Sequence, residues 1–266
     1  MATATADRPR LLSRLAWSSL AYNVFVILWG AVVRATGSGA GCGAHWPTCQ
    51  GEVVPLAPTV ATLIEYSHRL TSGLALVFVV AVLVMARRLR PAGHLVQFWA
   101  RAGLIFIVAE AAVGAGLVLF QKVAGDTSPA RGYWISGHLV NTFLLLATLT
   151  LTARFADEDR PREGGGVPGA LRASLPFGLA HPVVLLSALA LLATGVSGAI
   201  AALGDTLFKA ETLREAIAQD FSSTSHIFLR LRILHPAIAF AGGLFVLATA
   251  YRLISPVAER AEPRRS

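Results

Sequence analysis

The chain has 266 residues, of which 55% are hydrophobic and 14% are charged, and its mean hydropathy is +0.61. A water-soluble domain of this composition would expose large apolar patches, so these values exclude that class and indicate a membrane protein. The formal net charge of +8 lies mostly in arginine clusters between apolar runs. This distribution is a topology signal, and it argues against nucleic acid as the partner.

Six apolar runs reach the length of about 20 residues that a helix needs to cross a hydrocarbon core. In chain order they are residues 15–34, 61–86, 96–120, 133–153, 177–203 and 232–254. The first run is too long for the apolar part of a signal peptide and no small-residue cleavage site follows it, so we expect it to stay in the mature chain. The pattern predicts an all-α fold, a polytopic membrane helical bundle with six spans.

Basic and less basic loops alternate along the chain. The arginines that define this pattern are Arg8, Arg10, Arg14, Arg87, Arg88, Arg90, Arg101, Arg154, Arg160, Arg162, Arg172, Arg260, Arg264 and Arg265. Because basic loops stay on the cytoplasmic side, we expect a multi-pass protein of the cell (plasma) membrane with both termini in the cytoplasm. The loop between the first two runs then faces outward.

That outward loop contains both cysteines of the chain, Cys42 and Cys49, in the stretch "TGSGAGCGAHWPTCQG". Disulfides persist outside the cytoplasm, so the position favours a Cys42–Cys49 bond. The alternative is two unpaired small residues. A metal site is disfavoured because only His45 could join the two thiolates, whereas zinc takes about four ligands.

The sequence contains an internal repeat. "EYSHRLTSGLALVFVV" (65–80) and "RILHPAIAFAGGLFVL" (232–247) each place a histidine in the first turns of an apolar run, 167 residues apart. The same offset brings residues 30–41 close to residues 194–205, and two matches at one offset indicate a duplicated bundle.

The repeat suggests a division into three parts. We predict a four-helix N-terminal bundle over residues 1–154, a cytoplasmic linker over 155–176, and a partial, pseudo-symmetric bundle of two helices over 177–266. A complete second bundle would need two more helices, and these would begin near position 263.

Three histidines lie near the outer ends of apolar runs, where ionisable groups are costly and therefore suggest function. His68 and His138 lie at similar depth on separate runs, so they could bind one heme iron from opposite sides. His235 opens the sixth run, where the repeat predicts a second site. The alternative for each is an interfacial or hydrogen-bonded histidine. We interpret the other four as solvated (His45 and His94), helix-starting (His181) or in an exposed loop (His226).

Two carboxylates accompany these histidines. Glu65 precedes His68 by three residues, one helical turn, and could either orient the imidazole or act as an acid, a base or a cation-stabilising group. Glu110 lies in the middle of the third run, where a structural contact and a role in proton transfer are both open.

Four stretches together resemble the bacterial heme A synthases, the membrane hydroxylases of cytochrome oxidase assembly. They are "GAVVRATGSGAGCGAHWPTCQG", "EYSHRLTSG", "GHLVNTFLLL" and "GDTLFKAETLREAIAQDFSSTSHIFLRLRILHPAIA". The resemblance covers nearly the whole chain. It implies eight helices in two related four-helix bundles, oxidation of the C8 methyl of heme O to a formyl group, and a heme b cofactor in the second half.

The resemblance also implies roles for individual residues. Cys42 and Cys49 match the extracellular disulfide pair, Glu65 matches the catalytic carboxylate, His68 and His138 match the ligands of the substrate heme, and His235 matches the first ligand of the cofactor heme. The chain departs from the family in lacking the last two helices and the fourth histidine. A heme b in the second half would therefore have one protein ligand, would borrow another such as His226, or would be absent.

The implied partners are heme O, the enzyme that produces it, membrane lipid, an unidentified electron donor, and a second copy of the chain that could complete the second bundle. Two other functions stay open. The first is a membrane b-type cytochrome that carries electrons with a permanently bound heme b and no need for Glu65. The second is a non-catalytic heme-binding assembly protein that retains only the N-terminal bundle.

Overall fold

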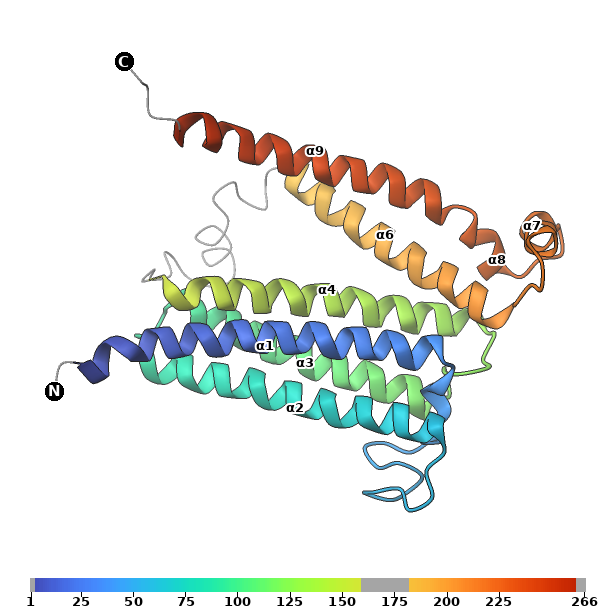
Figure 1. Cartoon of the computed structure of the whole chain (residues 1–266), viewed down its shortest axis with the longest axis horizontal. Helices are drawn as coiled ribbons and strands as arrows, with labels where there is room; N and C mark the ends of the chain where they lie inside the picture. Colours follow the sequence, from blue (N-terminus) through green and yellow to red (C-terminus); the bar gives the residue numbers. More distant parts are fainter. Residues whose placement is uncertain (1–2, 159–181, 262–266) are drawn as a thin grey trace. The chain divides into compact units, whose positions relative to one another are not determined.

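The structure is a computed structural model that describes residues 3–158 and 182–261 (Figure 1). Within these ranges no strand occurs, and the only β-type pairing is an isolated bridge between Cys49 and Glu52. The elements are α1 (Thr3–Ala35), η1 (Ser38–Ala40), α2 (Val60–Leu89), α3 (Leu95–Leu119), α4 (Pro129–Asp157), α6 (Pro182–Leu207), α7 (Leu213–Phe221), α8 (Ile227–Arg232) and α9 (His235–Ala261).

Six of these helical segments are long and apolar enough to cross a membrane, which confirms the all-α polytopic fold. The fourth extends beyond the predicted run, because Pro129 at the first helical position and Ser128 before it start α4 earlier than hydropathy suggests. The last begins at residue 227, with a short turn at residues 233–234 that separates α8 from α9.

The chain divides into two compact units, Met1–Ser174 and Leu175–Ser266. Most of the predicted linker, residues 159–176, lies outside the described residues, as does His181. Residues 155–157 of that linker are the last residues of α4.

The first unit is a four-helix bundle in which each helix packs against two neighbours. The main pairs are α1 with α2, α2 with α3, α3 with α4, and α4 with α1. Helices α2 and α4 therefore lie diagonally across the bundle, and both begin at the end where the loop 36–59 connects α1 to α2 (Figure 1). We call the loop 36–59 the disulfide loop and this end of the bundle the disulfide end.

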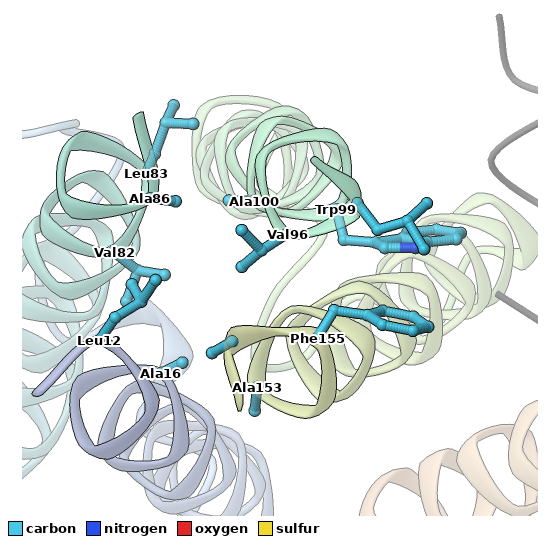
Figure 2. Close-up of a cluster of buried hydrophobic side chains, with 12 residues drawn as sticks. Leu12, Ala16, Val82, Leu83, Ala86, Val96, Trp99, Ala100, Ala153 and Phe155 are labelled. Carbon is cyan, nitrogen blue, oxygen red and sulfur yellow. The ribbon is translucent and has the colours of Figure 1, made fainter. Parts of the chain in front are cut away.

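The apolar core of this unit lies away from the disulfide end. One buried cluster joins the start of α1, the end of α2, the start of α3 and the end of α4, and includes Leu12, Val82, Val96 and Phe155 (Figure 2). A second cluster around Val79 and Leu145 lies further along the helices. Close packing at the far end stabilises the bundle and leaves polar side chains at the disulfide end.

His94 corrects one reading of the sequence. We expected a solvated side chain in a basic loop, but His94 is only 1% exposed. Its Nδ1 accepts a hydrogen bond from the N–H of Val96 and so caps α3, and its Nε2 lies 2.9 Å from the carbonyl oxygen of Glu158. A capping histidine satisfies a backbone donor that would otherwise be orphaned, which explains its burial.

The second unit consists of α6 packed against α8 and α9, with α7 in the connection between α6 and α8. Arg232, at the end of α8, forms ion pairs with Asp205 (2.5 Å) and Asp220. These contacts tie the connection 208–226 to the helices at the end where α9 begins.

Candidate functional site

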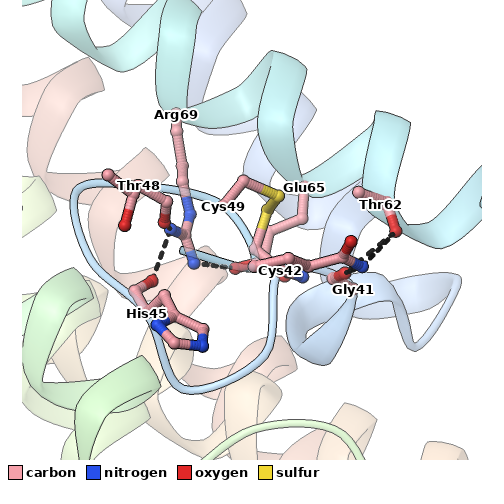
Figure 3. Close-up of polar contacts among 9 residues, drawn as sticks. Gly41, Cys42, His45, Thr48, Cys49, Thr62, Glu65 and Arg69 are labelled. Carbon is pink, nitrogen blue, oxygen red and sulfur yellow. Dashed lines mark hydrogen bonds and ion pairs between the residues drawn. A yellow bond between two sulfur atoms is a disulfide. The ribbon is translucent and has the colours of Figure 1, made fainter. Parts of the chain in front are cut away.

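The disulfide loop is fastened to the first turns of α2 (Figure 3). Cys42 and Cys49 form a disulfide and are fully buried. The Thr62 hydroxyl donates to the Gly41 carbonyl at 2.9 Å, and Arg69 donates to the carbonyl oxygens of His45 and Thr48, both at 2.6 Å. The loop is thus held by side chains of α2 as well as by its own crosslink.

Glu65 lies at the centre of these contacts and is 4% exposed (Figure 3). Its Oε2 accepts a hydrogen bond from the N–H of Cys42 at 2.8 Å, and its Oε1 is paired with Arg69 at 2.5 Å. No hydrogen bond joins Glu65 to His68 among the described residues, so this structure does not support the reading in which Glu65 orients His68. Arg69, whose role the sequence analysis missed, is the i+4 partner that helix spacing offers to a glutamate.

His68 lies against the backbone of α1 at Gly30. A Cβ added to Gly30 would lie 3.0 Å from His68 Cε1 and 3.3 Å from Nε2, so glycine lets the ring lie closer to α1 than a larger residue would. The Nδ1 atom of His68 is buried and has no hydrogen-bond partner among the described residues.

His138 is surrounded by polar groups of α3 and α4. Its Nδ1 lies 3.3 Å from Glu110 Oε1, a contact without full hydrogen-bond geometry. The Glu110 carboxylate also accepts hydrogen bonds from Thr142 (2.5 Å) and Asn141, and both residues lie one turn along α4 from His138. Glu110 is therefore held in place at the imidazole, a contact that the sequence analysis left open.

The two imidazoles lie at the same level of the bundle. His68 follows the first residue of α2 by eight positions and His138 follows the first residue of α4 by nine, and both helices start at the disulfide end. The pair thus comes from diagonal helices, and the His68 ring lies against Gly30.

This arrangement fits a heme. Two imidazoles from opposite sides are a usual axial donor set for heme iron. The His68 Nδ1 has no hydrogen-bond partner among the described residues, Gly30 lets the His68 ring lie against α1, and the His138 side chain is 32% exposed. A bare ion does not fit, because no group of three or more His, Cys, Asp or Glu side chains could hold one within the part of the chain that the structure describes.

The second unit repeats the imidazole environment on its own helices. A Cβ on Gly198 of α6 would lie 3.0 Å from His235 Cε1 and 3.3 Å from Nε2, the same values as for Gly30 and His68. The Ser197 hydroxyl lies 3.0 Å from His235 Nδ1. The repeat at offset 167 aligns Gly30 with Ser197, so the structural counterpart is one residue later than the sequence alignment predicts.

The remaining histidines are placed as follows. His45 is exposed in the disulfide loop, as expected. His226 is half-buried between Phe208 and Phe228, and its Nδ1 caps α8 by accepting from the N–H of Phe228. The expectation of an exposed loop residue is therefore wrong for His226, because the ring packs between two aromatic side chains.

Fold and site define a class: a polytopic membrane protein with paired intramembrane imidazoles of the kind that hold a porphyrin. Comparison with known proteins narrows the class. The cytochrome oxidase assembly protein family (COX15-CtaA) matches residues 13–265. The chain therefore belongs to this family, and its resemblance to the heme A synthases is confirmed.

Individual relatives also match this chain, and they carry two different names. A protoheme IX farnesyltransferase of Thermus thermophilus is 49% identical over 240 residues, which cover 90% of this chain and 38% of the relative. Heme A synthases of Halalkalibacterium halodurans (39% identical, 47% of this chain and 42% of the relative) and Exiguobacterium sibiricum (34%, 59% and 50%) match as well. The chain thus spans half or less of these relatives' lengths. No solved structure matches it significantly.

Proposed function

We propose that the chain takes part in heme A biosynthesis for cytochrome oxidase by oxidising the C8 methyl group of heme O to a formyl group. The observation that carries this proposal is the pair of imidazoles, His68 and His138, on diagonal helices of a family member. In this proposal the two histidines bind the iron of heme O, and the disulfide loop covers the mouth of the site on the outer face of the cell membrane, with both termini in the cytoplasm.

With water as the source of oxygen, oxidation of a methyl to a formyl group releases four protons and four electrons. The chain's own contribution is to fix the macrocycle and to supply a carboxylate beside it. Glu65 is well suited to that task because Cys42 and Arg69 hold it rigidly at the disulfide end, one turn from His68. A fixed anion there would stabilise positive charge that develops at the oxidised carbon, and could accept a proton from it.

His235 is the proposed first ligand of a heme b cofactor in the second unit. The contact of His235 with Gly198 supports this assignment, because it matches the contact of His68 with Gly30. Oxidation with water would need an electron acceptor protein, and oxidation with O2 would need an electron donor. A second copy of the chain is one candidate source of another ligand to this heme.

The name of the Thermus relative, protoheme IX farnesyltransferase, suggests where the heme substrate of this chain comes from. A protein so named acts on protoheme IX, and the present chain covers 38% of it. Because the cytochrome oxidase assembly family covers the same residues of this chain, we assign the oxidation to it and propose that heme O arrives from a farnesyltransferase partner.

Heme analysis tests the proposal. The chain is expressed in cells that make heme O and lack their own heme A synthase, and the extracted hemes are separated and identified by mass. We expect heme A or its hydroxylated intermediate. Glu65→Gln keeps an acceptor for the Cys42 N–H, and we expect it to lower the yield by about 100-fold or more.

The matched control is Glu52→Gln, since Glu52 is an exposed carboxylate of the same loop that accepts from the Leu56 N–H. This control should leave the yield unchanged. Heme b as the sole bound heme, with no effect of Glu65→Gln, would instead establish the electron carrier or the non-catalytic binder.

A further inference from the structure

We propose that Arg34 and Arg131 form a carboxylate-binding site at the disulfide end of the first unit, which takes the two carboxylates of the porphyrin whose iron lies between His68 and His138. The inference rests on the proposed heme site. It adds the orientation of the macrocycle within that site, and it assigns a role to two arginines that the proposed reaction does not otherwise use.

The two arginines lie on the same side of the imidazole level. Arg34 follows Gly30, the neighbour of His68, by four residues of α1, which is about 6 Å along the helix. Arg131 precedes His138 by seven residues of α4, about 10 Å. Spacings of four and seven keep residues on one helix face, so both arginines lie above the imidazoles toward the disulfide end.

Arg34 and Arg131 come from α1 and α4, which pack against each other, and both lie near the disulfide end of their helices. The opposite charge of Asp126 and the like charge of Arg34 both act on Arg131. Arg131 is 6% exposed and Arg34 is half-buried. Asp126 offsets part of the repulsion at Arg131, and a further anion beside the two cations would offset the rest.

Neither cation is neutralised by an ion pair with a described residue. The Arg34 guanidinium forms no hydrogen bond or ion pair with the side chains and backbone that the structure describes, and the buried Nε of Arg131 has no partner there. Arg131 donates through Nη1 to the carbonyl oxygens of Ala124 and Asp126. The Asp126 side chain is the nearby acid, but it pairs with Lys122 (3.3 Å) and accepts from Ser128 (2.9 Å).

A porphyrin supplies the matching anions. Its two carboxylates hang from one edge of the ring, so a macrocycle with its iron between the imidazoles places both on the same side of that level. Guanidinium groups bind carboxylates with two parallel hydrogen bonds, and a pair of arginines matches a pair of carboxylates. A lipid phosphate is also an anion, but Arg131 is only 6% exposed, and this burial favours a ligand that lies inside the bundle.

This orientation would determine which methyl group is oxidised. The C8 methyl adjoins a carboxylate-bearing position of the ring, and Glu65 lies on the disulfide side of His68 by three residues, about 4.5 Å along α2. Arginines that draw the carboxylates toward the disulfide end would also turn the C8 edge toward the side of Glu65.

Esterification of the carboxylates tests the inference. The full chain in phosphatidylcholine nanodiscs is titrated with iron protoporphyrin IX and with its dimethyl ester, and binding is followed by the absorbance of the bis-imidazole complex. We expect the diacid to bind about tenfold more tightly than the diester. Arg34→Gln should remove most of this preference by weakening diacid binding alone, and Arg34→Lys should retain part of it.

Arg34 is the residue to replace because its guanidinium forms no hydrogen bond or ion pair with the described residues. Arg131→Gln would also release the loop before α4. Arg101→Gln, an exposed arginine of α3, is the matched control and should keep the full preference. Equal affinity of the wild type for diacid and diester, or an unchanged preference in Arg34→Gln, would overturn the inference and leave the heme site standing.

A binding site for a lipid headgroup would give a different result in the same experiment. If Arg34→Gln reduced only the retention of phosphatidylglycerol and left the heme preference intact, the arginines would bind a headgroup and the inference would be wrong. If the wild type bound neither form of heme, the proposed heme site would fail, and the inference with it.

Discussion

The two units place a histidine in the same surroundings but secure the adjacent connection with opposite charges. In the first unit Gly30 lies against His68, and in the second Gly198 lies against His235, with equal Cβ distances to Cε1 and Nε2. Three residues before each histidine, the first unit has Glu65 and the second has Arg232. Glu65 holds the disulfide loop through Cys42, whereas Arg232 holds its connection through Asp205 and Asp220.

This difference shows which of these residues are needed to hold a connection in place and which suit the proposed chemistry. A connection can evidently be fastened to the helix by either charge, so fastening alone does not require a carboxylate at position 65. The imidazole, by contrast, occurs in both units together with the glycine that makes room for it. We therefore interpret the histidine and glycine as the shared heme-binding element, and the carboxylate as the feature that distinguishes a site of oxidation from a site of electron transfer.

Among the variants that compare the two units, replacement of the histidines should have the largest effect on heme binding. His68→Ala removes an axial donor from the first unit, and we expect loss of the substrate heme and a decrease in heme A formation of at least about 100-fold. His235→Ala should remove heme from the second unit and leave a bis-imidazole heme in the first. Absorbance spectra and heme-to-protein ratios of the two purified variants distinguish these outcomes. Identical heme loss in both variants would contradict two separate sites.

The partner of the imidazole Nδ1 also differs between the units, and exchanging it should have an intermediate effect. Glu110 offers a carboxylate to His138, whereas Ser197 offers a neutral hydroxyl to His235. An anionic partner orients a ligating imidazole and strengthens its donation to the metal, so Glu110→Gln should weaken heme binding by about 10- to 100-fold. It should also raise the reduction potential of the first heme.

Ser197→Ala is the companion variant in the second unit. It removes a neutral contact, so its effect on heme affinity should be smaller than that of Glu110→Gln. Redox titration of both variants, with Glu110→Asp as the conservative replacement, measures the difference. A potential that does not move in Glu110→Gln would show that Glu110 serves packing only.

The sequence predicts the membrane fold well, because hydropathy alone determines where six long helices form. It also points to His68, His138 and His235 as candidates, since an ionisable group within an apolar run is conspicuous. Contacts between segments are harder to predict. Nothing in the local pattern indicates that the Cys42 N–H reaches Glu65, and the cap formed by His94 is hidden because a histidine in a basic loop usually faces water.

The glycines also show that contacts between segments are hard to predict from the sequence. Small residues are frequent in membrane helices, so the sequence does not distinguish Gly30 and Gly198, which face imidazoles, from Gly73 and Gly243, which face open space. The alignment by offset even paired Gly30 with Ser197. Only the packing of α1 on α2 and of α6 on α9 shows which glycine touches the ring.

These glycines provide the prediction with the smallest effect. Gly30→Ala and Gly198→Ala each place a Cβ 3.0 Å from an imidazole Cε1, so the ring must move by a few tenths of an ångström. Overpacking of this kind costs about 1–3 kcal/mol, and we expect heme in the affected unit to bind about tenfold more weakly.

Gly73→Ala and Gly243→Ala are the matched controls, because a Cβ at either position meets no atom within 4 Å. Each should leave heme affinity unchanged and increase helix stability slightly, since alanine loses less backbone freedom than glycine on folding. Heme titration of the four variants therefore tests whether the two units share one binding element. If Gly30→Ala weakened heme binding and Gly198→Ala did not, the second unit would have retained the shape of a heme site without its function.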